Sequence, residues 1–198
     1  TPSLRGTLDA RMGWYIIFGT LPIAVFGLVF ADEIKTVARD LRLTASMLII
    51  FGILLYLADR FRPQTKEQKD LTLKDGMIFG FAQALALIPG VSRSGATITA
   101  GRMLGYNRET AARFSFLLSI PAIVLSGLFE MKDIGSSGSV PWGPTIVATL
   151  VSFAVGYASI AWLLKWLTSH SVLVFTVYRI VVGLGIFALL GAGVLASG

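Results

Sequence analysis

The sequence predicts an all-α integral membrane protein. Apolar residues make up 55% of the 198-residue chain and charged residues only 14%, whereas a soluble domain carries about 25% charged residues. The mean hydropathy of +0.76 agrees with this. The basic residues behind the net charge of +6 lie at the ends of apolar runs, as in membrane proteins, so we expect no nucleic-acid partner. The chain has no cysteine and a single histidine, which excludes disulfide scaffolds and histidine-rich metal centres.

Five apolar segments reach or approach the length that crosses about 30 Å of hydrocarbon as a helix. They are Gly13–Ala31, Leu43–Ala58, Ala111–Phe129, Gly143–Leu164 and Val172–Ala196. None of them contains an aspartate or a glutamate. The second segment is short for a span, and we expect it to borrow flanking residues while Arg42 and Arg60 extend to the interface. Pro22 and Pro121 fall inside two spans, which membrane helices tolerate when neighbours satisfy the freed carbonyls.

A sixth apolar stretch, Gly76–Gly105, predicts a re-entrant hairpin. Two short apolar arms flank a Pro-Gly break, each arm is too short to cross, and Arg93 stands between them. If the hairpin returns to its own side, one face of the membrane carries most of the basic residues, whereas a single crossing divides them almost equally. The re-entrant arrangement is therefore favoured, within one integral membrane domain covering residues 1–198.

The break itself reads Pro-Gly-Val-Ser-Arg-Ser-Gly-Ala-Thr at residues 89–97. Ser94 is expected to cap the half-helix that follows, which leaves unpaired N–H groups facing the break. The amino terminus of a helix is a natural site for an anion, above all for phosphate. Ser92, Ser94 and Thr97 add hydroxyl groups, and Arg93 offers a planar fork for two phosphate oxygens.

Small polar residues can instead serve only to let helices pack closely, as expected of the pairs Gly76/Gly80 and Gly101/Gly105. This alternative stays open for the serines and the threonine. It does not suit Arg93, because an arginine at mid-membrane costs about 2.5–3.5 kcal/mol or more and normally faces a partner or a watery cavity. The residues alone therefore indicate an intramembrane anion site.

Three stretches, LALIPGVSRSGATITAG, AARFSFLLSIPAI and VYRIVVG, make the chain resemble the undecaprenyl-diphosphate phosphatase (bacitracin-resistance) family of bacterial inner membranes. The resemblance implies a multi-pass hydrolase that removes the terminal phosphate of undecaprenyl diphosphate. That reaction recycles the lipid carrier of cell-wall synthesis and confers bacitracin resistance. It also implies a fold of membrane helices and two re-entrant hairpins in inverted repeats.

The resemblance implies that Arg93 and Ser92 are the catalytic residues of this chain. Whether Ser92 is the nucleophile is left open, and so is the role of Arg179, which either reaches the diphosphate or pairs with helix carbonyls. The substrate-binding residues that we expect are Ser94, Gly95, Thr97, Gln83 and Arg179.

One part of the family pattern is not found. The family's first motif, a glutamate-bearing stretch that ends in proline, serines, glycine and histidine, does not occur in this sequence. A diphosphate needs more positive charge than Arg93 supplies, so we expect a divalent cation, magnesium or calcium, whose ligands are not in this chain. The resemblance thus implies that the chain is the carboxy-terminal portion of the family domain and is incomplete for catalysis.

The alternative function is a polyprenyl-phosphate transporter or flippase, because broken helices that meet at mid-membrane are also a transporter feature. The partners expected under either function are a polyprenyl diphosphate or phosphate lipid and the bilayer. A homodimer is a further option.

Overall fold

The computed structural model describes residues 7–37, 40–61, 63–134 and 142–196. Regular structure in these ranges consists of helices joined by short connections. The α-helices are α1 (Leu8–Val29), α2 (Ala31–Val37), α3 (Leu41–Phe61), α4 (Leu73–Ala84), α5 (Arg93–Met103), α6 (Arg108–Ile134), α7 (Trp142–Leu167) and α8 (Leu173–Gly191). Two 3-10 turns, η2 (Gln68–Asp70) and η3 (Leu85–Leu87), complete the description.

The five predicted spans are confirmed. Helices α1, α3, α6, α7 and α8 are each long and apolar enough to cross a membrane. Several helix ends differ from the ends of the predicted apolar segments. Helix α1 begins at Leu8 rather than Gly13, because the hydroxyl of Thr7 accepts a hydrogen bond from the N–H of Ala10 (3.3 Å) and caps the helix there. Helix α8 ends at Gly191 and not at Ala196, since the chain turns at Gly193 with a φ of +70°.

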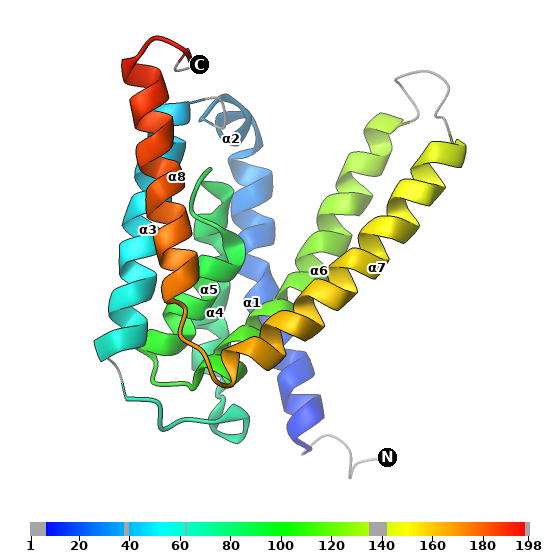
Figure 1. Cartoon of the computed structure of the whole chain (residues 1–198). Coiled ribbons are helices and arrows are strands. Elements are labelled where there is room, and N and C mark those ends of the chain that lie inside the picture. Colours follow the sequence, from blue (N-terminus) through cyan, green and yellow to red (C-terminus); the bar gives the residue numbers. More distant parts are fainter. Residues whose placement is uncertain (1–6, 38–39, 62, 135–141, 197–198) are drawn as a thin grey trace.

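The structure has a hairpin of two short helices where the re-entrant hairpin was predicted. Helices α4 and α5 have 12 and 11 residues, well short of the roughly 20 that a crossing needs. They lie side by side between α1 on one flank and α3 with α8 on the other, and both return to the same end of the molecule (Figure 1). The first arm begins at Leu73, slightly before the predicted start, because Thr72 and Asp75 form a reciprocal capping box (3.2 and 3.1 Å).

Close backbone contact holds the first arm against α1. A Cβ on Gly80 would lie 2.2 Å from the carbonyl oxygen of Gly19, so no larger residue fits without separating α4 from α1. The predicted packing role of Gly80 is therefore confirmed. Gly105, by contrast, has a φ of +91° and ends the second arm, which makes it a turn residue and not a packing residue.

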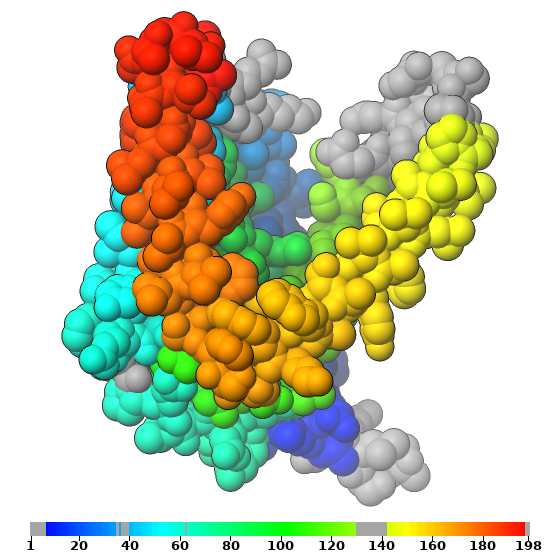
Figure 2. Space-filling model, viewed as in Figure 1, coloured from blue at the N-terminus to red at the C-terminus, as the bar shows by residue number. Residues whose placement is uncertain are grey.

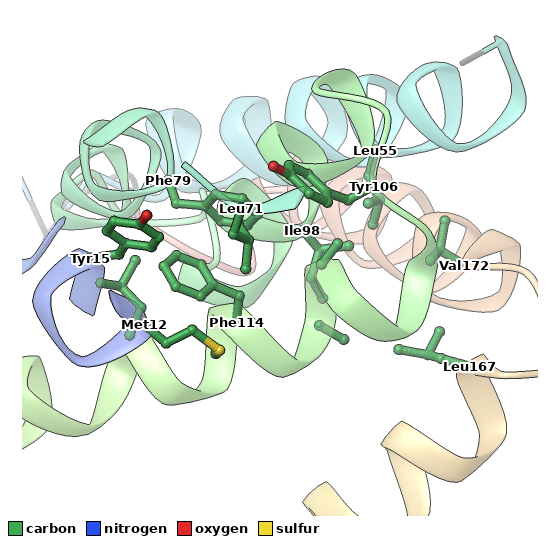
Figure 3. Packing of buried hydrophobic residues seen from close by; sticks show 13 residues of the cluster. Met12, Tyr15, Leu55, Leu71, Phe79, Ile98, Tyr106, Phe114, Leu167 and Val172 are labelled. Carbon is green, nitrogen blue, oxygen red and sulfur yellow. The ribbon is translucent and has the colours of Figure 1, made fainter. Parts of the chain in front are cut away.

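The apolar core lies where α4, α6 and the turn between α5 and α6 pack together (Figure 3). The ring of Phe79 packs edge-on against Phe114, with 4.8 Å between centroids, and lies 6.2 Å from the ring of Tyr106. These three side chains are almost completely buried and come from α4, α6 and the turn that links α5 to α6. The core thus fixes both arms of the hairpin to the start of α6.

A charged network fixes the base of the hairpin as well. Arg102, near the end of α5, is fully buried and donates to Asp59 Oδ1 (3.0 Å), to the Asp59 carbonyl (3.0 Å) and to the Tyr106 carbonyl (2.6 Å). Arg108 donates to both carboxylate oxygens of Asp59 (2.8 and 3.0 Å). Asp59 lies in the last turn of α3 and is 7% exposed.

The Tyr106 hydroxyl forms further hydrogen bonds at the base of the hairpin. It donates to Asp75 Oδ2 (2.8 Å) and lies 3.1 Å from the carbonyl oxygen of Asp70. Burial, together with the hydrogen bond to Asp75, raises the pKa of Tyr106 above its ordinary value. The phenol therefore stays protonated and keeps its hydrogen bonds across the physiological pH range.

Helices α6 and α7 diverge from the remaining helices (Figure 1), and Figure 2 shows an open wedge between their upper parts and the rest of the molecule. In the most apolar window of α7 none of the residues is buried against other described parts of the chain. The hairpin, α1, α3 and α8 therefore form the compact part of the fold, in which the candidate site lies.

Candidate functional site

The hairpin reverses direction at residues 88–92. Ile88 is extended (φ −81°, ψ 124°), as expected of a residue that precedes proline, and it ends the 3-10 turn η3. Gly90 has a φ of +87°, and a Cβ there would lie 2.2 Å from the carbonyl oxygen of Thr44 on α3. Glycine alone combines this backbone with so close an approach. The break is therefore held against α3.

Ser92, not Ser94, caps α5. The Oγ of Ser92 accepts a hydrogen bond from the N–H of Gly95 (3.3 Å), and its carbonyl accepts one from Ala96 (2.9 Å). The prediction that Ser94 caps α5 was wrong. Ser92 has a positive φ of 66°, which places its hydroxyl over the first turn of α5, and Ser94 lies within that turn. Such a backbone costs a serine about 1–3 kcal/mol, and residues strained in this way cluster at functional sites.

Arg93 is the first residue of α5, and its side chain is half-buried. Its guanidinium makes no hydrogen bond or ion pair with another described residue, and the same holds for the backbone N–H groups of Arg93 and Ser94 within the described ranges. The positive end of α5 and an uncompensated guanidinium thus occupy the same position, beside the exposed Ser92. These groups together form a donor set for a phosphate.

A second guanidinium reaches the break from α8. Arg179 is 5% exposed, and its Nη2 donates to the carbonyls of Gly90 (2.9 Å) and Val91 (2.8 Å). Its Nε donates to the carbonyl of Leu48 on α3 (3.3 Å). The Nη1 atom lies so close to Gly95 that a Cβ there would approach it to 2.6 Å. Arg179 therefore pairs with backbone carbonyls, which was one of the two roles predicted for it. It also lies at the amino terminus of α5.

Thr97 and Gln83 are buried beneath the break. The Thr97 hydroxyl donates to the carbonyl of Arg93 (2.8 Å) and forms a short hydrogen bond with Ser115 on α6. This hydroxyl positions Arg93 and joins α5 to α6. The side chain of Gln83 is fully buried, and neither its amide oxygen nor its amide nitrogen has a hydrogen-bond partner among the described residues. Buried amides are rarely left in that state without a function or a missing partner.

The break suits an anion better than a metal ion. Its donors are a guanidinium, backbone N–H groups and hydroxyls, whereas magnesium and calcium take oxygen ligands, above all carboxylates. Across the described ranges, no three histidine, cysteine, aspartate or glutamate side chains gather where they could hold a metal ion. The residues that the structure brings together here do not fit the expected cation.

The sequence analysis did not identify Asp59 as a residue that holds the hairpin in place. A signal was present in helical periodicity. Gly52, Leu55 and Asp59 follow one another at intervals of three and four residues, which places Asp59 on the buried face of the same helix. A carboxylate at such a position needs a buried cation, and Arg102 and Arg108 supply two.

The fold defines a multi-pass helical membrane protein, and the break in its short helical hairpin brings together donor groups of a kind that suits an anion. The chain belongs to the family of the bacitracin resistance protein BacA, whose family model matches residues 3–185.

Curated relatives agree with that assignment. The chain is 50% identical to undecaprenyl-diphosphatase 2 of Streptomyces avermitilis, in an alignment that covers 98% of this chain and 70% of the relative. It is 53% identical to undecaprenyl-diphosphatase of Thermobifida fusca, over 97% of this chain and 66% of that protein. It is 54% identical to undecaprenyl-diphosphatase of Streptomyces griseus, over 98% and 71%. The chain thus spans about two thirds of the length of these relatives.

Proposed function

We propose that the chain acts as an undecaprenyl-diphosphate phosphatase in a bacterial plasma membrane. It hydrolyses undecaprenyl diphosphate to undecaprenyl phosphate and inorganic phosphate. The family and the names of its relatives support this reaction, and they do not favour the alternative of a polyprenyl-phosphate transporter. The reaction returns the lipid carrier to cell-wall synthesis, which fits the bacitracin resistance for which the family is named.

The observation that carries the proposal is the uncompensated guanidinium of Arg93 at the amino terminus of α5. In the reaction an oxygen nucleophile attacks the terminal phosphorus, and the bridging oxygen leaves with the polyprenyl phosphate. Negative charge spreads over the phosphoryl oxygens and the leaving oxygen as the bond breaks. The fork of Arg93 and the free N–H groups of the first turn bind these oxygens, and their alignment before substrate arrives lowers the barrier.

Ser92 has one of two roles in this reaction. Its Oγ already accepts the N–H of Gly95, so its O–H remains available to donate to a phosphoryl oxygen. The alternative is that Oγ attacks phosphorus and forms a phosphoserine, which water then hydrolyses. The strained backbone and the exposure of Ser92 support a direct contact with substrate in either role.

The other predicted residues act around Arg93. Ser94 offers its backbone N–H and hydroxyl, and Gly95 leaves room between Ser92 and Arg179. Thr97 and Arg179 position the break, and the unpaired amide of Gln83 is a candidate hydrogen-bonding group for bound substrate. We retain magnesium or calcium as the expected cation, since it would offset the remaining diphosphate charge. Chelator should abolish turnover and added cation should restore it.

The experiment is phosphate release from a detergent-solubilised polyprenyl diphosphate, using protein expressed from its complete gene. Arg93→Lys keeps the charge but loses the fork, and we expect turnover to fall about 10–150-fold, the equivalent of one charge-assisted hydrogen bond. Arg93→Ala should lose more. Arg113→Lys, at an exposed arginine at the start of α6, is the matched control and should retain activity. Near-normal turnover in Arg93→Lys would show that the guanidinium does not bind phosphate in this way.

A further inference from the structure

A polar cavity lies at the opposite end of the hairpin from the break. It has a volume of about 340 Å³ and forms where the end of α3 meets the starts of α6 and α8. The end of α3 and the start of α8 lie at the lower end of these two packed helices in Figure 1. Its lining residues are Tyr56, Asp59, Arg60, Gln64, Arg108, Ser171 and Leu173.

The charge around this cavity is positive. Its one carboxylate, Asp59, is already bound by Arg108 through two hydrogen bonds and by the buried Arg102 through a third. One of these two arginine charges is therefore left without a counter-charge. Arg60 adds another, because it is exposed and forms no ion pair or hydrogen bond with any other described residue. Two guanidinium groups, those of Arg60 and Arg108, therefore line the cavity beside a single carboxylate, and the buried Arg102 binds that carboxylate from behind.

The start of α8 adds to the positive electrostatic potential in the cavity. Ser171 lines the cavity and accepts a hydrogen bond from the N–H of Leu173 (3.3 Å), at the amino terminus of a 19-residue helix. The positive end of the helix dipole therefore points toward the cavity that the arginines line. Such a site has a surplus of donors and of positive charge, which an anion would satisfy.

The rim of the cavity is apolar on the side of the bilayer. Leu173 is 46% exposed, Phe61 is 71% exposed and Tyr56 is 38% exposed, and they continue into the exposed apolar faces of α8 and α3. The segment that joins α3 to α4 lies at the same end of the molecule (Figure 1), and its sequence contains Lys66 and Lys69. This excess of positive charge marks that end as the cytoplasmic side. Basic pockets between membrane helices on that side bind the phosphate headgroups of anionic lipids.

We propose that this cavity binds the phosphodiester headgroup of an anionic membrane lipid from the cytoplasmic leaflet. Arg60 and the free edge of Arg108 contact the phosphate, while the acyl chains lie against the apolar rim. The apolar rim favours a lipid over a free phosphate ion, which would gain nothing from it. This site is separate from the hairpin break and does not depend on the reaction proposed there.

Native mass spectrometry of the purified protein tests the proposal. The protein is titrated with dioleoyl phosphatidylglycerol or with dioleoyl phosphatidylcholine, which share acyl chains and differ in headgroup charge. The first phosphatidylglycerol should bind more tightly than phosphatidylcholine. Arg60→Gln should weaken phosphatidylglycerol binding about fivefold, as expected for one arginine near an anionic lipid surface, and Gln64→Glu should weaken it by a similar factor. Both residues are exposed, so folding should not change.

Lys74→Gln is the matched control, because it removes one exposed positive charge from the same end of the molecule outside the cavity. It should leave phosphatidylglycerol binding unchanged. An equal loss in Lys74→Gln and Arg60→Gln would show a diffuse charge effect and overturn the proposal. Displacement of phosphatidylglycerol by millimolar inorganic phosphate would overturn it as well, since the ligand would then be a free ion.

Discussion

The two ends of helix α5 each carry an arginine, and their surroundings differ. Arg102 is fully buried, and all its donor nitrogens are used on Asp59 and on the carbonyls of Asp59 and Tyr106. Arg93, nine residues earlier, is half-buried and has no such partner in the described part of the chain. The role of an arginine in the membrane therefore depends on whether a counter-charge lies beside it, and not on the residue type alone.

The energetic reason is the cost of removing charge from water. A buried guanidinium is tolerated when a carboxylate and further hydrogen bonds replace its hydration, and removal of one partner of such a pair is strongly destabilising. The base of the hairpin meets this condition and ties α3, α5 and α6 together. At the break, no described residue supplies a counter-charge for Arg93. A phosphate ester supplies that charge in the proposed reaction.

The largest effect is expected at the base. Asp59→Asn keeps the shape of the side chain but leaves Arg102 buried without a counter-charge. The free energy of unfolding should fall by about 3–5 kcal/mol. Thermal unfolding followed by tryptophan fluorescence in detergent measures this, with Asp32→Asn on the exposed face of α2 as the control. Unchanged thermal stability would show that the two ends of α5 do not differ as described.

The next effect is expected where the break touches α3. Gly90→Ala would place a Cβ 2.2 Å from the Thr44 carbonyl oxygen, at a φ of +87° that alanine disfavours. The break must shift, so we expect turnover to fall at least tenfold, with about 1–3 kcal/mol of destabilisation from the strained backbone. Gly127→Ala, where a Cβ would meet nothing within 4 Å, is the control. Full activity in Gly90→Ala would mean that the contact with α3 does not position the site.

The smallest effect separates the two serines beside Arg93. Ser92→Ala removes the hydroxyl that caps α5 and should cost about 1 kcal/mol of stability, whereas Ser94→Ala removes no cap. A turnover loss in Ser92→Ala as large as that of Arg93→Ala would assign Ser92 as the nucleophile, and a milder loss would assign it as a donor. Equal thermal stability of the two serine variants would contradict the cap observed at Ser92.

Much of the fold could be predicted from the sequence. Span length follows from the thickness of the bilayer, and the Pro-Gly pair at residues 89–90 indicated where the hairpin turns. The base of the hairpin could not be predicted, because the partners of Asp59 lie 43 and 49 residues further along the chain. Nothing local in the sequence shows that α3 ends beside the turn between α5 and α6.

The candidate site was predicted in outline. Ser92, Arg93 and Ser94 lie together at the break, and Arg179 pairs with backbone carbonyls there, which was one of its two predicted alternatives. The capping residue was wrong because a positive φ on serine is rare and is imposed by tertiary contacts rather than by sequence. The burial of Thr97 beneath the break was missed for a similar reason, since its partner Ser115 comes from α6. The substrate-contacting roles of these residues stay predictions.

One matched pair of variants tests the central claim most directly. Arg93→Gln and Arg102→Gln make the same change at the two ends of α5, and each purified variant is measured for phosphate release per folded molecule and for thermal unfolding. Arg93→Gln should lose most turnover with unchanged unfolding, since it removes an uncompensated charge from the membrane. Arg102→Gln should unfold at a clearly lower temperature, while the molecules that remain folded keep most of their turnover. Equal losses of turnover and of stability in both variants would contradict a phosphate-binding role for Arg93 and a structural role for Arg102.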